Sequence, residues 1–129
     1  MKPKYAVAVL LCLAATSLGQ NEPDLLAKYQ TELNASPNSS LTHFRLGEIY
    51  FQQGSFQSAA NELREALNGD LQSRWIETWS HLDLGKIFDA TGQRGRAVNE
   101  YTQVQRTKDD TRGALEEAAM YQQFPYPHK

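Results

Sequence analysis

Residues 43–63 read HFRLGEIYFQQGSFQSAANEL, and residues 81–101 read HLDLGKIFDATGQRGRAVNEY. At an offset of 38 residues, eight of the 24 positions from 43 to 66 are identical, where ordinary amino-acid usage gives about one or two chance matches. The identical residues of the first copy are His43, Leu46, Gly47, Ile49, Gly54, Ala59, Asn61 and Glu62. Recurrence at this spacing is typical of an array built from one supersecondary unit.

Each copy has the pattern of two helices joined by a tight turn. Apolar residues recur at helical spacing before and after Gly54, and the same holds around Gly92. Glycine at these two places suits the left-handed backbone conformation that ends a helix. We therefore predict two antiparallel helix hairpins with no strands.

Two further glycines lie inside the predicted helices. In a helix interior, Gly47 and Gly85 each cost about 1 kcal/mol relative to alanine. Because they recur in register, with Ala59 and Ala97 on the second helices, we expect the two helices of each hairpin to cross closely there. A surface glycine with no packing role is the alternative.

The copies share a Leu-Gly pair, an aromatic residue, a turn glycine and small residues in the second helix. These are Leu46-Gly47, Tyr50, Gly54, Ala59, Leu63 and Ala66 in the first copy, and Leu84-Gly85, Phe88, Gly92, Ala97 and Tyr101 in the second. The pattern resembles the tetratricopeptide repeat, a helix–turn–helix unit of about 34 residues. The resemblance implies an all-α fold: a short right-handed α-solenoid of antiparallel hairpins with a C-terminal capping helix.

The sequence departs from the family pattern in three ways. His43 and His81 stand where the family has a large aromatic residue, and the closing prolines are missing near Leu71 and Asp109. The offset of 38 exceeds the family's repeat by about one helical turn. We expect the extra turn within residues 71–80, LQSRWIETWS, at the start of the helix that follows.

These patterns divide the chain into a signal peptide, a helical domain and a tail. The domain, residues 20–122, comprises a half repeat (22–38), two repeats (40–70 and 73–107) and a capping helix (110–122). Residues 123–129 contain two prolines and are predicted to form a flexible tail. A docking peptide within this tail is the alternative.

The first 19 residues have the pattern of a secretory signal peptide. Lys2 and Lys4 precede the apolar stretch Tyr5–Ala15, and cleavage is expected after Gly19. The single cysteine, Cys12, lies in this stretch, so the mature chain would contain no disulfide. We expect a secreted or periplasmic protein without membrane attachment after cleavage; a retained anchor is the alternative.

Composition and motifs argue against several functions. The net charge of −2 and the absence of clustered basic residues argue against nucleic-acid binding. Equivalent positions of adjacent repeats lie about 10 Å or more apart, too far for His43 and His81 to share a zinc ion. Glu62 and Glu100 fit solvated helix faces. We therefore predict no catalytic residue, metal or cofactor; an enzyme or metal site at the two histidines is the less favoured alternative.

Stacked hairpins leave a concave face lined by the first helix of each unit. Such a face can hold a peptide or a partner helix through aromatic anchors and a few charges. The predicted lining residues are Phe44, Arg45, Glu48, Phe51, Gln52, Trp79, Asp83, Lys86 and Asp89. The alternative for Phe44 and Trp79 is a place in the core. In some family members a lysine/asparagine clamp holds a peptide carboxylate, but Phe44 and Glu48 occupy the matching positions, so that specificity is not expected.

The sequence thus predicts a non-enzymatic module that binds a protein partner, with self-association as a further possibility. A structural component of a cell-envelope complex, without a peptide-binding groove, is the alternative.

Overall fold

The computed structural model describes residues 23–127, and this part of the chain is all-helical, without strands. A helix over residues 23–35 comes first. It is followed by α2 (Ser40–Gln52), α3 (Phe56–Asn68), α4 (Arg74–Ala90), α5 (Arg94–Thr107), the 3₁₀ turn η1 (Thr111–Gly113) and α6 (Ala114–Gln123). The predicted signal peptide lies outside the described residues. None of the helices between residues 23 and 127 combines the length and hydropathy that a bilayer span requires.

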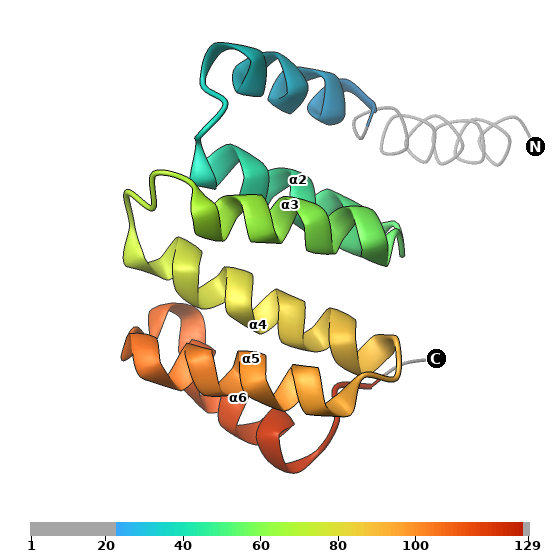
Figure 1. The fold of residues 1–129 in the computed structure, drawn as a ribbon, viewed down its shortest axis with the longest axis vertical. Coiled ribbons are helices and arrows are strands. Elements are labelled where there is room, and N and C mark those ends of the chain that lie inside the picture. Colours follow the sequence, from blue (N-terminus) through green and yellow to red (C-terminus); the bar gives the residue numbers. More distant parts are fainter. Residues whose placement is uncertain (1–22, 128–129) are drawn as a thin grey trace, which may run out of the picture.

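The helices form two antiparallel hairpins in sequence. Helix α2 packs along α3, α4 packs along α5, and α3 joins the two hairpins by packing against α4. Figure 1 shows helix 23–35 beyond α2 at one end of the stack and α6 against α5 at the other. The predicted hairpins are therefore present, and α6 covers the last of them.

The hairpin turns repeat in detail. Gly54 has a φ of +76° and Gly92 a φ of +75°, the left-handed conformation predicted for both. The first helices end at Gln52 and Ala90, which lie 38 residues apart in the sequence. The predicted turns are thus confirmed at equivalent positions.

Helix α4 contains the extra turn that the 38-residue offset implied. It has 17 residues, whereas α2 has 13. The additional residues are Arg74–Glu77 at its N-terminal end, within the stretch 71–80. Trp75, in this extra turn, packs edge-on against Phe44 of α2, with ring centroids 5.5 Å apart. The added turn therefore contributes to the contact between the hairpins.

The two interior glycines lie where the helices of each hairpin cross. A Cβ atom at Gly47 would lie 2.9 Å from the side chain of Leu63 and 3.5 Å from the carbonyl oxygen of Ala59. A Cβ atom at Gly85 would lie 2.7 Å from Cδ1 of Tyr101. The expected close crossing is confirmed. At Gly85 the atoms nearest to the added Cβ belong to the ring of Tyr101, a contact that the sequence did not predict.

Buried hydroxyl groups close the other end of each hairpin. Ser40 Oγ donates to the carbonyl oxygen of Ala66 at 2.6 Å, within the first hairpin. At the equivalent position of the second hairpin, Thr78 Oγ1 donates to Thr107 Oγ1 at 2.9 Å. Both donors are fully buried, so these bonds satisfy groups that water does not reach.

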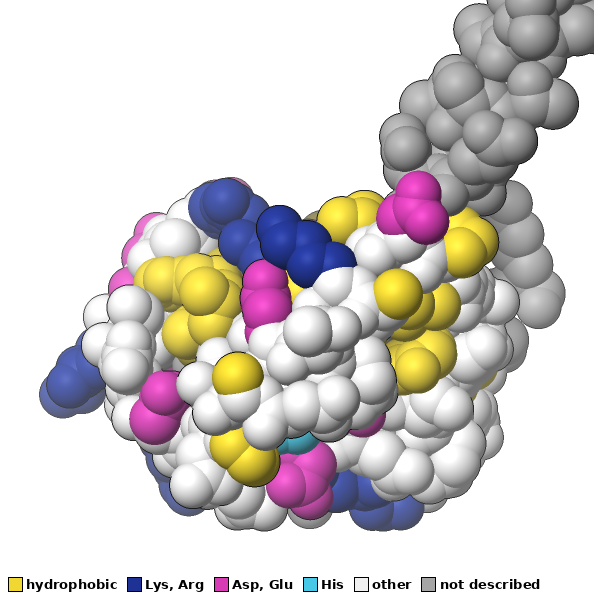
Figure 2. Space-filling view, turned by 90° about the horizontal axis from the view of Figure 1, so that it is seen from above, with side chains coloured by type: hydrophobic (Ala, Val, Ile, Leu, Met, Phe, Trp, Pro, Cys, Tyr) yellow, Lys and Arg dark blue, Asp and Glu magenta, His cyan; other side chains and the backbone are white. Residues whose placement is uncertain are grey.

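Figure 2 looks onto the end of the molecule nearest helix 23–35. Hydrophobic side chains on this face occur in separate patches, with charged and polar side chains between them. Along helix 23–35, Leu33 is buried, Leu26 and Tyr29 are half-buried, and Leu25 is exposed. This helix therefore buries one side only, as an amphipathic end helix does.

The glycine at the second helix crossing provides a direct test of the packing. Gly85→Ala should lower the free energy of unfolding by about 1–3 kcal/mol, because the added methyl group overpacks against Tyr101. Gly95→Ala is the matched control: a Cβ atom there meets nothing within 4 Å, so alanine should be neutral or stabilising. Urea unfolding of both variants checks this, and equal stability would contradict the proposed role of Gly85.

Candidate functional site: the inner face of α2 and α4

The nine predicted lining residues differ widely in exposure. Phe44 is only 2% exposed and belongs to the core, which was the alternative for this residue. Asp83 and Asp89 are also buried. Trp79 is half-buried. The predicted lining residues are therefore more deeply buried on α4 than on α2. We use the name inner face for the surface that carries the other predicted residues. These are Arg45, Glu48, Phe51 and Gln52 of α2, and Trp79 and Lys86 of α4.

The α2 part of the inner face is accessible. Arg45 Nη1 lies 3.0 Å from Glu48 Oε1, and its guanidinium lies over the ring of Trp75 at 5.7 Å. The ring of Phe51 packs edge-on against Phe56 at 5.8 Å and is half-buried. Gln52 is exposed. These four predicted residues remain within reach of a partner.

The α4 part of the inner face is covered by residues from the C-terminal segment, Thr111 to Tyr126. The indole N–H of Trp79 donates to the carbonyl oxygen of Thr111 at 2.9 Å. The ammonium of Lys86 lies 5.6–5.8 Å from the ring centroids of Trp79, Tyr121 and Tyr126. It also lies 3.2 Å from Glu117 Oε2, close enough for an ion pair but not aligned as a hydrogen bond. The cation is thus held among three aromatic faces.

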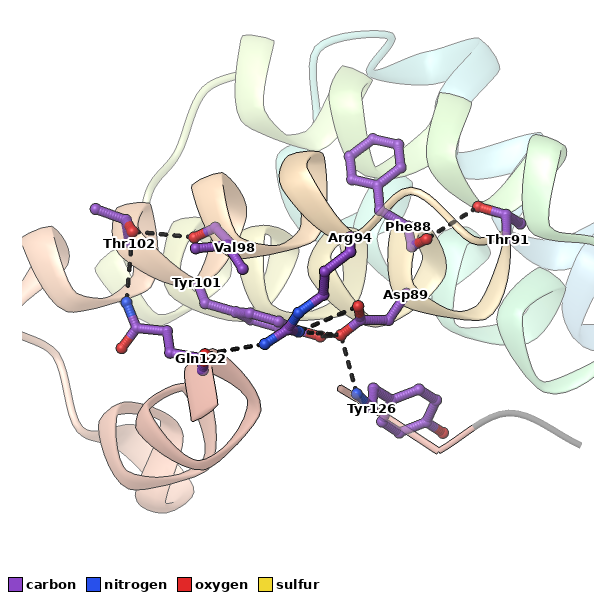
Figure 3. Close-up of polar contacts among 9 residues, drawn as sticks. All are labelled: Phe88, Asp89, Thr91, Arg94, Val98, Tyr101, Thr102, Gln122 and Tyr126. Carbon is purple, nitrogen blue, oxygen red and sulfur yellow. Dashed lines mark hydrogen bonds and ion pairs between the residues drawn. The ribbon is translucent and has the colours of Figure 1, made fainter. Parts of the chain in front are cut away.

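Asp89 is the centre of a buried polar network, drawn in Figure 3. Its Oδ2 accepts from the hydroxyl of Tyr101 at 2.7 Å and from Nη1 of Arg94 at 3.0 Å. It also accepts from the backbone N–H of Tyr126 at 2.9 Å. Arg94 Nη2 in turn donates to the carbonyl oxygen of Gln122 at 2.9 Å. The buried carboxylate is therefore fully paired, which its desolvation requires.

The same environment affects Tyr101. Burial, followed by the hydrogen bond to the Asp89 carboxylate, raises the pKa of this phenol above its usual range. The side chain is fully buried and stays neutral, so it acts as a permanent donor to Asp89. This fixes the carboxylate at the C-terminal end of α4.

The two hairpins fill the same pair of positions with different chemistry. In the first hairpin, Phe51 and Phe56 form a ring pair across the Gly54 turn. The residues 38 positions later are Asp89 and Arg94, which form an ion pair across the second turn. An apolar contact in one copy is thus replaced by a charged one in the other. This difference makes the inner face apolar beside the first turn and polar beside the second.

The C-terminal residues lie across this boundary. Besides its N–H bond to Asp89, Tyr126 places its ring 6.2 Å from that of Phe51 and 5.3 Å from that of Tyr121. It therefore contacts both equivalent positions of the two hairpins. The sequence pattern predicted a flexible tail at residues 123–129 and did not predict these contacts. The aromatic residues spaced among the prolines were the available signal.

Next to Tyr126 the surface contains an open pocket of about 440 Å³. It is lined mainly by apolar groups. The lining residues are Phe51, Gln52, Gly54, Phe56, Ala90, Tyr126 and Pro127. Two of the predicted residues, Phe51 and Gln52, thus line a hollow that could take a further apolar side chain.

The two histidines are half-buried, as structural histidines are, and each has a partner that the sequence did not predict. His43 Nδ1 lies 2.8 Å from Glu62 Oε2, and His81 Nδ1 lies 2.6 Å from Glu100 Oε2. Each pair joins the first helix of a hairpin to the second, at equivalent positions. Glu62 and Glu100, expected to be solvated, are therefore paired. Within residues 23–127 no group of three or more His, Cys, Asp or Glu side chains is placed to hold a metal ion.

Asp83 lies between the two ends of the inner face. Burial raises the pKa of its carboxyl from 3.8 to about 7, and nearby Lys86 opposes this shift while Glu48 and Glu117 add to it. No hydrogen bond to its carboxyl occurs within the described chain, so the positive charge of Lys86 is the main interaction that opposes the effect of burial. The site therefore contains an acid that gains or loses its proton near neutral pH.

No protein-family model matches this sequence, and no match was found among curated proteins.

Removing the hydroxyl of Tyr101 tests the network around Asp89. Tyr101→Phe should lower the free energy of unfolding by about 1–3 kcal/mol, because a buried carboxylate loses a donor. Tyr121→Phe is the control, since no hydrogen bond of its hydroxyl occurs within residues 23–127, and its effect should be near zero. Urea unfolding at pH 7 compares them; a Tyr101→Phe variant as stable as the control would refute this account.

The carboxyl of Asp83 should make stability depend on pH. Between about pH 4 and pH 7 the unfolded chain releases the Asp83 proton while the folded chain keeps it, so folding becomes less favourable as pH rises. Asp83→Asn removes this effect. The variant should match the parent near pH 4 and exceed its stability at pH 8 by up to about 4 kcal/mol. A difference that stays constant from pH 4 to pH 8 would contradict the pKa assignment.

Proposed function

We propose that this chain is an exported, non-enzymatic binding module of the tetratricopeptide type, built as a short right-handed α-solenoid. It would hold a segment of another protein on the inner face. The repeated hairpins with equivalent turns support the repeat architecture. The N-terminal pattern of residues 1–19 supports export to the periplasm or the cell exterior.

The observation that carries this proposal is the accessible α2 part of the inner face. Phe51 and Gln52 line a pocket of about 440 Å³, and the Arg45–Glu48 pair lies on the same helix. A half-buried ring beside a hollow and flanking charges is the arrangement found at binding hot spots. The engagement of His43 and His81 with glutamates supports a structural role for both histidines.

A scaffold function is the second candidate. Met120 and Phe124 are 49% and 67% exposed, and both lie outside the inner face, on α6 and just after it. Exposed apolar side chains on an end helix favour docking onto a larger complex or a second copy. In this case the inner face would be dispensable.

Paired substitutions distinguish the two candidates. The tagged protein is crosslinked in its native cell, and the attached proteins are compared between variants. Phe51→Ala with Gln52→Ala should lower recovery of the main partner about tenfold or more, as loss of a hot spot does. Asn61→Ala with Glu65→Ala, at exposed positions of α3, is the control and should leave recovery unchanged.

Two other results would count against groove binding. Equal recovery from both double variants would favour the scaffold function. A well-folded monomer that captures nothing in the cell would refute both candidates.

A further inference from the structure

We propose that residues Pro125–Pro127, with Tyr126 as the contacting side chain, are a built-in occupant of the inner face, and that the partner segment has the same chemistry and displaces them. This inference rests on the proposed function and specifies its ligand: an extended segment with an aromatic side chain next to proline. The extended backbone of the tail supports this choice of ligand. Phe124 is extended, with φ −125° and ψ 126°, and Pro125 and Pro127 restrict the chain to such conformations.

The tail binds through one residue. Tyr126 is half-buried, while Phe124, Pro125 and Pro127 are exposed. Its N–H bonds to Asp89, and its ring meets Phe51 and lies 5.6 Å from the Lys86 ammonium. A single main-chain hydrogen bond and one half-buried ring give a weak attachment, of the kind that a competitor can replace.

The site under the tail does not depend on the tail. Without Tyr126, the carboxylate of Asp89 would still accept from Tyr101 and Arg94. Phe51 would still pack against Phe56. The acceptor and the apolar surface are therefore held in place by α5 and α3, so the face is preorganised for another extended segment.

The pocket beside Tyr126 indicates how a partner would outcompete the tail. This pocket of about 440 Å³ lies between Phe51 and Phe56 on one side and Tyr126 and Pro127 of the tail on the other, and the tail leaves it open. A partner segment with a second apolar side chain near its aromatic residue would bury that side chain here. The partner's own aromatic residue and proline would replace Tyr126 and Pro127 as walls of the pocket, so the partner would keep the tail's contacts and add one.

The positions that the tail touches are equivalent in the two repeats. Phe51 and Asp89 are 38 residues apart, and Tyr126 contacts both. A ligand in this orientation crosses from one hairpin to the next. The tail therefore shows the path that a partner segment would follow.

The test uses full-length chains and two synthetic peptides. The probe is a fluorescent peptide of residues 122–129, QQFPYPHK, and binding is followed by anisotropy. If the tail occupies the face about nine-tenths of the time, Tyr126→Ala should bind the probe about tenfold more tightly than the parent protein. Phe124→Ala, at an exposed position, is the control and should bind like the parent.

Two further measurements establish where the probe binds. Adding Phe51→Ala to Tyr126→Ala should weaken binding about tenfold or more, and a probe with alanine in place of its tyrosine should not bind. Circular dichroism melting checks that the variants fold. The proposal would be overturned if the Tyr126→Ala variant bound the probe no more tightly than the parent protein. It would also be overturned if adding Phe51→Ala left the affinity for the probe unchanged.

Failure of this inference can be told apart from failure of the proposed function. If no variant binds the probe at millimolar concentration, but the Phe51→Ala/Gln52→Ala pair still loses its cellular partner, the ligand assignment is wrong and the groove function stands. If cellular recovery is also unchanged, the groove function is wrong as well.

Discussion

The contact between Gly85 and Tyr101 determines how the second hairpin is built and what its inner face contains. Because glycine leaves no side chain at the crossing, the ring of Tyr101 can pack directly against α4 while its hydroxyl donates to Asp89. Asp89 then accepts from Arg94 and from the backbone of Tyr126. A packing requirement at the centre of the hairpin is in this way connected to the surface where the C-terminal residues lie. In the first hairpin the equivalent residue is Leu63, which fills the same gap but cannot make this connection.

The repetition in the sequence predicted most of the hairpin architecture. Helix periodicity, the turn glycines and the 38-residue offset together located both hairpins and the extra turn of α4, because each depends on residues close in the chain. The contact of Gly85 with Tyr101 was not predicted, because nothing local in the sequence indicates that a tyrosine one turn after Ala97 lies nearest to the glycine. Side-chain direction across a hairpin depends on the rotation of both helices, which a periodic pattern constrains only loosely.

The candidate site was less predictable for the same reason. Phe44 and Phe51 are both aromatic residues on α2, yet Phe44 is buried in the core and Phe51 is half-buried at its edge. The C-terminal segment covers Lys86 and Asp89 through contacts between residues about 30 to 40 positions apart in the sequence. No repeated pattern in the sequence indicates these contacts. The pairing of each histidine with a glutamate was readable in principle, because both members recur at the same offset. The pairing was not predicted, because Glu62 and Glu100 were interpreted only from the polar faces of their own helices.

The extra turn of α4 has a consequence for how this unit could be multiplied. Trp75 lies in that turn and packs on the preceding hairpin, whereas the residue 38 positions earlier is Pro37. Tandem copies of residues 74–107 would each bring a tryptophan to the junction with the copy before. Tandem copies of residues 40–68 would not, and their junctions would lack that ring. The second unit is therefore the better template for a designed array.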